Sequence, residues 1–416
     1  MKTDLTIESI DEASLRLKGV VKKTPLQYNK RLSNQYKAHV YLKREDLQDV
    51  RSYKIRGAYN LMSTLTLDEK KSGVVCASAG NHAQGVALSS SLLKIRSVIF
   101  MPSITPLQKI NKVKHFGGRF ITIKLVGQTY DEASHAAKEF CKKNHMVFVH
   151  PFDDLRTIAG QGTVGKEIYD QKTASLDYVL CPVGGGGLIS GVSSYLKAKD
   201  SKVKIIAVEA EGAPTLFEAL KNKKIVDLNK VDTFVDGTAV KTLGKIPFEI
   251  AITKVFKSIL VAEGKVSTTM IELYQNEGIV TEPAGALSVA ALEEIKGEIK
   301  GKHVVCIISG GNNDILRYPE IMERSLVYLG LKHYFLIEFA QKPGQLKKFV
   351  NKVLGPTDDI VRFEYMKKTS KERGPALIGI ELQRKKDLKR LLDKMNKEGI
   401  RYTKLESSDP LYSYLI

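Results

Sequence analysis

The chain has 416 residues and a formal net charge of +19, with 43% hydrophobic and 27% charged residues. This composition is typical of a soluble globular protein with room for two or three domains. Residues 1–20 lack a signal-peptide pattern, and no apolar run reaches the ~20 residues that span a bilayer, which disfavours secreted and membrane proteins. The basic residues are spread along the whole chain without a dense arm, so nucleic-acid binding is also disfavoured.

The cysteines indicate a reducing compartment. The chain has four of them, Cys76, Cys141, Cys181 and Cys306, far apart in the sequence and without CxxC spacing, and three of the four lie in apolar, strand-like runs. We therefore expect reduced thiols in the core of a cytoplasmic protein.

The run RSYKIRGA places Lys54 between the aromatic Tyr53 and the apolar Ile55, with small residues following. A lysine in such a run usually lies in solvent on a helix face. If Lys54 is buried instead, its amine loses proton affinity and becomes a usable nucleophile at neutral pH. We expect Arg51 and Arg56 to stay at the surface.

From about residue 70 to residue 310, short β-branched runs alternate with longer helical stretches. Strands are expected at 72–78 and 95–101, and helices at 81–93 and 105–116. This alternation predicts an α/β fold with doubly wound parallel sheets that helices cover on both faces. Ligands in such folds bind at the carboxyl ends of the strands, where loops lead into helices.

Two of these loops offer polar groups at the sheet edge. In the first, small residues end a strand and Asn81 opens a helix, which suits the binding of a carboxylate or a phenolate oxygen. Asn81 is equally compatible with a simple helix cap. In the second, Ser309 ends the strand-like run HVVCIIS and puts a hydroxyl at the edge of the sheet, but the loop is equally compatible with a flexible turn.

The third loop has four consecutive glycines, Gly184, Gly185, Gly186 and Gly187, between a strand and a helix. Glycines let the backbone approach an anion closely, and the free amides at the start of the helix point towards it. The spacing does not fit GxGxxG, which disfavours dinucleotide binding. A tight packing turn needs fewer glycines, so a phosphate-binding loop is the favoured interpretation.

Residues 160–167 nearly fit the Walker A pattern GxxxxGK[ST]. Glu167 replaces the hydroxyl that would hold magnesium, and no clean strand precedes the run. We therefore expect a helix whose small residues pack closely on the sheet, and no ATP site.

The pattern changes near residue 330, where the order of elements becomes β-α-β-β-α-β. That order predicts a ferredoxin-like α+β unit, a four-stranded antiparallel sheet with two helices on one face. We place the boundary at roughly 318–332 and expect domains at 1–325 and 333–416. The second domain has no obvious catalytic cluster, which indicates ligand sensing or assembly.

Taken together, these runs resemble the fold-type II enzymes that depend on pyridoxal phosphate (PLP), most closely the biosynthetic threonine dehydratases. The likeness covers essentially the whole chain. The family segment SFKxRGA reads here as residues 52–58, with Tyr53 in place of phenylalanine, and the family loop SAGNHAQGVA is intact at residues 78–87. The resemblance implies a small subdomain at about 76–150 inserted in the catalytic domain.

The resemblance also implies how the cofactor is held. Lys54 is expected to carry PLP as a Schiff base, and Asn81 to contact the 3′-oxygen of the cofactor. The glycine loop, from Gly184 to Leu188, is expected to hold the phosphate, and Ser309 to face the pyridine nitrogen.

The implied reaction is β-elimination of L-threonine to 2-oxobutanoate and ammonia, with Lys54 taking the α-proton. The substrate carboxylate is expected to lie against one loop, made of Ser78, Ala79, Gly80, Asn81 and His82. Ala79 stands where related serine racemases carry a second catalytic serine, which favours one-sided chemistry. Thr215 stands where those relatives have a metal-binding aspartate, so no divalent metal is expected, and a monovalent cation stays open.

The C-terminal domain resembles the ACT-like regulatory domain of the same family. Its effector turn is expected at Pro343, Gly344, Gln345 and Leu346. The resemblance implies feedback inhibition by isoleucine, with valine as a second candidate effector, and a homotetramer. Two alternatives stay open: a serine dehydratase or β-replacing enzyme of the same fold, and a non-catalytic protein that binds nucleotides or nucleic acid.

Overall fold

The computed structural model describes residues 5–365, 372–406 and 409–415. The expected domain ranges, 1–325 and 333–416, also contain residues 1–4, 366–371, 407–408 and 416, which lie outside the described residues. The chain divides into two compact units: one contains Met1–Glu263 and Glu272–Asn313, and the other contains Gly264–Ile271 and Asp314–Ile416. The domain limits expected from the sequence remain predictions.

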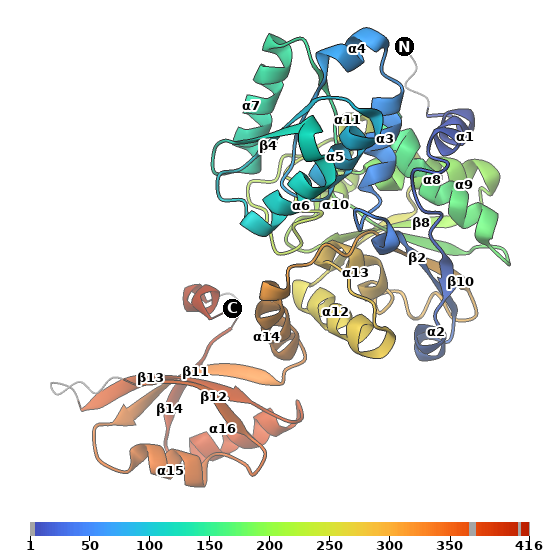
Figure 1. The fold of residues 1–416 in the computed structure, drawn as a ribbon. Coiled ribbons are helices and arrows are strands. Elements are labelled where there is room, and N and C mark those ends of the chain that lie inside the picture. The colour runs from blue at the N-terminus through green and yellow to red at the C-terminus, as the bar shows by residue number, and fades with distance from the viewer. Residues whose placement is uncertain (1–4, 366–371, 407–408, 416) are drawn as a thin grey trace. The chain divides into compact units, whose positions relative to one another are not determined.

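The larger sheet of the first unit has the strand order β1-β2-β10-β7-β8-β9. Its strands are β1 (Leu26–Tyr28), β2 (His39–Arg44), β7 (Tyr178–Pro182), β8 (Lys204–Ala210), β9 (Lys257–Val261) and β10 (His303–Ile308). β1 pairs with β2 in an antiparallel manner, and all other pairs are parallel. In Figure 1, α13 (Pro283–Ala290) lies on one side of this sheet, and α8 (Leu155–Gln171) and α9 (Gly187–Lys199) lie on the other. This arrangement confirms the predicted parallel sheet with helices on both faces.

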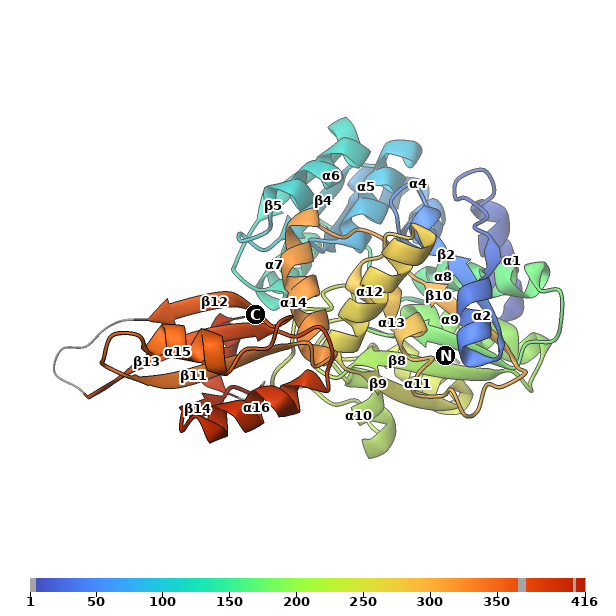
Figure 2. The ribbon, with the colours of Figure 1, turned by 90° about the horizontal axis from the view of Figure 1, so that it is seen from below.

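The smaller sheet of the first unit is entirely parallel, in the order β5-β4-β3-β6. Its strands are β3 (Val74–Ala77), β4 (Ser97–Met101), β5 (Ile121–Leu125) and β6 (Val147–Phe148). Every residue of β3 and β4 is buried, as expected for central parallel strands. Figures 1 and 2 show α5 (Asn81–Leu93), α6 (Leu107–Gly117) and α7 (Tyr130–Lys143) beside this sheet.

The two helices expected near this sheet are present. The helix expected at 81–93 has the same limits in the structure, and the one expected at 105–116 is α6. α6 begins two residues later than expected because Pro106 is extended, with ψ 140°. Gly118 ends α6 with φ +50°, a conformation that glycine adopts without strain.

The remaining helices of the first unit cover the sheets or connect them. They are α1 (Ile7–Arg16), α2 (Lys30–Tyr36), α3 (Lys54–Ser63), α4 (Leu67–Ser72), α10 (Thr215–Asn222) and α11 (Lys245–Lys254), while α12 (Glu263–Glu277) contributes residues to both units. All four cysteines are free and buried, as predicted. Within the described ranges, no helix is both long enough and apolar enough to cross a membrane.

The Walker-like run lies inside α8, so the predicted helix is confirmed. Its small residues pack against other helices, however, and not against the sheet. A Cβ atom added to Gly160 would lie 2.3 Å from the carbonyl oxygen of Arg56 in α3, and one added to Gly191 of α9 would lie 2.5 Å from the nitrogen of Gly162. The glycines therefore let α3, α8 and α9 approach at backbone distance.

The second unit contains an antiparallel sheet in the order β12-β13-β11-β14. Its elements are α14 (Tyr318–Tyr328), β11 (Lys332–Ala340), α15 (Gln345–Lys352), β12 (Asp359–Tyr365), β13 (Arg373–Glu381), α16 (Asp387–Lys397) and β14 (Arg401–Lys404). Phe349 of α15 and Leu391 of α16 share one apolar core with alternate residues of β11 and β13. Both helices therefore cover the same face, which confirms the predicted ferredoxin-like unit.

Candidate active site

Lys54 is the first residue of α3. Its Nζ atom donates a hydrogen bond to the backbone oxygen of Pro151 at 3.2 Å. Burial lowers the pKa of Lys54 to about 8, and the charge of Glu282 opposes this effect. A pKa near 8 leaves a useful fraction of free amine at neutral pH, as a nucleophile or a base requires.

Arg56 is fully buried, so its expected surface location was wrong. Its guanidinium forms ion pairs of 2.7 Å with Glu45 and of 2.7 Å with Glu167 of α8. Arg51, in contrast, is exposed as expected. Both acidic partners lie outside the run of residues 51–58, and Glu167 lies 111 positions away, so the local pattern gave no sign of them. These ion pairs attach the helix that begins with Lys54 to α8.

Asn81 is held by two side chains from other segments. Its Nδ2 atom donates to Oε1 of Glu282 at 2.7 Å, and its Oδ1 atom accepts from Nδ2 of Asn312 at 2.7 Å. Ser309 is buried at the end of β10, and its hydroxyl donates to the carbonyl of Ala284 at 3.3 Å. The structure therefore brings the Asn81 loop and the loop after Ser309 together.

The segment before Lys54 contacts the loop after Ser309 directly. The backbone N–H of Tyr53 donates to the carbonyl of Ser309 at 3.2 Å, and Ser52 forms an antiparallel bridge with Gly310. Loops that follow three different strands, β2, β3 and β10, are thus joined by hydrogen bonds around Lys54.

The loop expected to bind the substrate carboxylate opens α5. The N–H of Gly80 donates to the hydroxyl of Ser78 at 3.1 Å, and Ala79 lies between them. Nε2 of His82 lies 2.8 Å from the carbonyl of Val149, and burial lowers the pKa of His82 to about 3. His82 is therefore neutral at pH 7, so it brings no positive charge to a carboxylate, and the amides at the start of α5 are the donors of this loop.

The glycine loop follows β7 and leads into α9, which begins at Gly187. A Cβ atom added to Gly185 would lie 2.2 Å from the ring of Phe152, and one added to Gly187 would lie 2.5 Å from Oε1 of Gln161. Gly186 has φ +89°, a conformation that favours glycine. Leu188 is buried in the first turn of α9. The loop therefore has a shape that residues with side chains could not adopt.

Buried polar atoms near these loops test whether the site fits PLP. Among the described residues, the Oγ atom of Ser52 and the Oε1 atom of Gln161 are buried without a hydrogen-bond partner. Gln161 also donates to the carbonyl of Pro151, the same oxygen that accepts from Lys54. Unpartnered polar atoms, a glycine loop at a helix start and an amine of lowered pKa together fit an aldehyde cofactor with a phosphate group.

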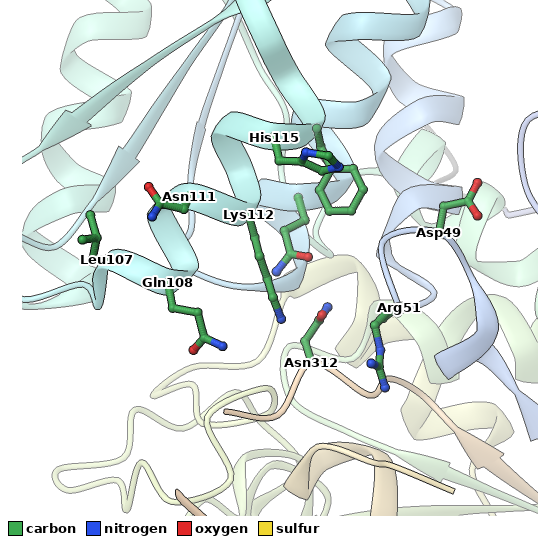
Figure 3. Close-up of a pocket in the computed structure, with 10 residues that line it drawn as sticks. Asp49, Arg51, Leu107, Gln108, Asn111, Lys112, His115 and Asn312 are labelled. Atoms are coloured by element: carbon green, nitrogen blue, oxygen red, sulfur yellow. The ribbon is translucent and has the colours of Figure 1, made fainter. Parts of the chain in front are cut away.

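An open pocket of ≈ 650 Å³ lies beside this site and is lined by α6, the 49–51 segment and Asn312. Figure 3 shows Lys112 extending from α6 towards Asn312 and Arg51. Asn312 is also the residue that bonds Asn81. The pocket therefore adjoins the candidate cofactor site.

The remaining predicted positions are placed as follows. In the second unit, Pro343 and Gly344 lie in the turn between β11 and α15, where Gly344 has φ +85°, and Gln345 and Leu346 are the first residues of α15. Glu209 accepts hydrogen bonds from the N–H groups of Leu216 and Phe217 and from the hydroxyl of Thr215. In the part of the chain that the structure describes, no group of three or more His, Cys, Asp or Glu residues could hold a metal ion.

Three residues at the site escaped the sequence analysis: Glu282, Asn312 and Gln161. Glu282 directly precedes Pro283 at the start of α13, a position where an acidic residue is usually read as a helix cap. Gln161 lies inside the Walker-like run, at a position that the Walker A pattern leaves unspecified. No local signal marks Glu282 and Asn312, because both bond Asn81, which lies in a distant part of the chain.

Comparison with known proteins agrees with this geometry. A family model described as "Pyridoxal-phosphate dependent enzyme" matches residues 17–310, and one described as "C-terminal regulatory domain of Threonine dehydratase" matches residues 323–415. A protein named L-threonine dehydratase biosynthetic IlvA from Halalkalibacterium halodurans is 52% identical over 412 residues, with 99% of each chain covered. A protein of the same name from Bacillus subtilis is 50% identical over 412 residues, with 99% of this chain and 98% of that relative covered.

Solved structures of related enzymes also match the chain. The processed form of threonine deaminase isoform 2 from Solanum lycopersicum matches with a TM-score of 0.75 and 37% identity, covering 79% of this chain and 90% of that one. Maize serine racemase matches with a TM-score of 0.72 and 30% identity, covering 78% and 98%. The chain belongs to the family of biosynthetic threonine dehydratases, and its catalytic part is that of the pyridoxal-phosphate dependent enzymes.

Proposed function

We propose that this enzyme eliminates the β-hydroxyl of L-threonine and releases 2-oxobutanoate and ammonia, with PLP attached at Lys54. The assignment of Lys54 rests on the connection between its amine and the proposed phosphate site. Its amine, with a pKa lowered to about 8, shares the carbonyl of Pro151 with Gln161, and Gln161 reaches the glycine loop at Gly187. The amine and the proposed phosphate site are thereby connected through the carbonyl of Pro151 and the side chain of Gln161.

The chain's own residues have separate tasks in this proposal. The amides of the glycine loop and the start of α9 bind the phosphate, and Asn81 and Ser309 bind the two polar edges of the cofactor ring. When bound, PLP supplies an electron-poor ring that stabilises negative charge at the α-carbon of the substrate. Lys54 takes the α-proton at Nζ, and its lowered pKa makes the free amine available for this.

The carboxylate of the substrate is proposed to lie against Ser78, Ala79, Gly80, Asn81 and His82. Since His82 is neutral, the binding relies on N–H groups and on the dipole of α5. Ala79 offers no hydroxyl for a second base, which supports elimination over racemisation.

Regulation is proposed to act through the second unit. The turn at residues 343–346 is the proposed binding site for isoleucine, with valine as a competing effector, and a homotetramer is the proposed assembly. The match of residues 323–415 to a regulatory-domain family supports regulation as such. A cytoplasmic location is also proposed, supported by the four free, buried cysteines.

The test is the turnover of L-threonine, L-serine and O-acetylserine, each with and without isoleucine, by the wild-type protein and by Lys54→Ala. We expect 2-oxobutanoate and ammonia from threonine, inhibition by isoleucine, and loss of activity in Lys54→Ala. A higher kcat/KM with serine would indicate a serine dehydratase, and replacement chemistry on O-acetylserine would indicate a β-replacing enzyme. Threonine turnover that isoleucine leaves unchanged would remove the regulatory part of the proposal.

A further inference from the structure

Glu282 is a buried carboxylate at the candidate site. It belongs to none of the sequence motifs, and the proposed chemistry gives it no role. It is 5% exposed, precedes the first residue of α13, and makes no side-chain capping hydrogen bond to that helix. Its Oε1 atom instead accepts from Nδ2 of Asn81 at 2.7 Å. A Cβ atom added to Gly310 would lie 2.4 Å from the same oxygen, so the absence of a side chain at Gly310 leaves room for the carboxylate.

The hydrogen bonds around Asn81 determine which way its amide faces. Nδ2 of Asn312 donates to the carbonyl of Val50 at 2.7 Å, and a carbonyl can only accept, so this atom must be the nitrogen. The same nitrogen donates to Oδ1 of Asn81, which leaves Nδ2 of Asn81 facing Glu282. An amide nitrogen carries two N–H groups, and Glu282 takes one of them. The second N–H of Asn81 remains for another acceptor.

We propose that Glu282 is a positioning residue: its carboxylate holds the amide of Asn81 so that the second N–H is presented to the phenolic oxygen of PLP. This inference rests on the proposed function, because it requires PLP to bind with that oxygen at Asn81. A reversed amide would present Oδ1, an acceptor, to the oxygen of the cofactor and would repel it when the phenol is ionised.

The charges around Glu282 come from several segments. Burial raises the pKa of Glu282 to about 7, and repulsion from Asp236 adds to this, while the hydrogen bonds of Asn81 and of the Asn312 backbone and the charge of Lys109 act in the opposite direction. Lys109 of α6 forms an ion pair of 2.8 Å with Asp236. The charge of Glu282 also acts on Lys54. The carboxyl group can accept from Asn81 in either protonation state, because a protonated carboxyl keeps its carbonyl oxygen.

Two variants of Glu282 separate positioning from the filling of space. Glu282→Met keeps the approximate length of the side chain and removes the acceptor, whereas Glu282→Gln keeps both the length and an acceptor oxygen. The full-length apoprotein of each variant is titrated with PLP and, separately, with 3-deoxypyridoxal phosphate, which lacks the phenolic oxygen. Binding is followed by absorbance, and the fold of each variant by circular dichroism.

We expect Glu282→Met to weaken PLP binding by about tenfold and to leave the binding of the deoxy analogue nearly unchanged, because only the phenolic oxygen has lost its donor. Glu282→Gln is expected to bind PLP within about threefold of the wild type. Equal weakening for both ligands in Glu282→Met, or no weakening for either, would overturn the inference.

Failure of the proposed function has a different signature. In that case wild-type apoprotein would bind PLP no better than Lys54→Ala does, whatever stands at position 282. That outcome removes the inference together with the assignment of Lys54. Suppose instead that wild-type protein binds PLP at Lys54, but Glu282→Met shows the same relative affinities for PLP and for the deoxy analogue as the wild type. The proposed function then stands, and the role of Glu282 is refuted.

Discussion

Arg51 and Arg56 flank Lys54 in the sequence, yet only Arg56 is buried. Replacing Arg56 with Ala would leave the carboxylates of Glu45 and Glu167 without their guanidinium partner, Glu45 in a fully buried position. We expect this change to lower the free energy of unfolding by about 3–5 kcal/mol. Arg51→Ala is the matched control and should change it by less than about 1 kcal/mol. Urea unfolding measures both values, and equal small effects would contradict the role given to the buried ion pairs.

The lowered pKa of Lys54 predicts how the reactivity of its amine depends on pH. Burial disfavours the ammonium form, so the pKa of Lys54 falls from 10.5 to about 8, and the negative charge of Glu282 partly restores it. In the apoprotein, the rate at which Lys54 reacts with an amine-selective reagent should therefore reach half its maximum near pH 8. Glu282→Gln removes the charge that favours the ammonium, and should move this midpoint to lower pH.

Glu209→Gln serves as the control for that titration. Glu209 is also a buried glutamate with a pKa raised to about 7 by burial, but its partners are Leu216, Phe217, Thr215 and Ser258. Glu209→Gln should leave unchanged the pH at which the reaction rate of Lys54 is half its maximum. A wild-type midpoint near that of an ordinary lysine, or an equal shift in both variants, would contradict the surroundings described for Lys54.

Among the elements, α8 and α9 depend on one another's glycines. In Gly191→Ala the new Cβ atom would lie 2.5 Å from both the nitrogen of Gly162 and the carbonyl oxygen of Ile158. Alanine favours a helix by up to about 1 kcal/mol over glycine, but such backbone overlap forces the helices apart. We expect a net loss of about 1–3 kcal/mol in unfolding free energy. Gly297→Ala, with nothing within 4 Å of the added atom, should be close to neutral, and equal stability of the two variants would contradict the close approach.

The positions of the helices and strands can be predicted closely from the sequence, but which elements lie next to one another cannot. β-Branched runs predicted β3 and β4, and the helices expected at 81–93 and 105–116 correspond to α5 and α6, because these signals are local. The order β1-β2-β10-β7-β8-β9 joins strands far apart in the chain, which no local pattern specifies. The same reason explains the burial of Arg56, which depends on Glu45 and Glu167, and the role of Glu282, which depends on Asn81.

At the scale of the whole molecule, the second unit matches a family of regulatory domains, and the proposed effector turn in it can be tested by mutation. Gly344 has φ +85°, so Gly344→Val strains the turn at residues 343–346. We expect this variant to retain threonine turnover and to lose sensitivity to isoleucine by about tenfold or more, the loss that follows from about 1.4 kcal/mol of binding. Gly399→Val imposes the same kind of strain at φ +66° elsewhere in the unit. It should keep the sensitivity to isoleucine, and equal loss in both variants would point to general disruption of the unit.

The attachment of the cofactor at Lys54 is the central claim, and chemical trapping tests it most directly. Borohydride fixes PLP covalently on the lysine that holds it, and mass spectrometry of the digested protein then identifies that residue. We predict a single modified peptide that contains Lys54, and none in Lys54→Ala. Modification of a different lysine, or threonine turnover by Lys54→Ala at the wild-type rate, would contradict the assignment.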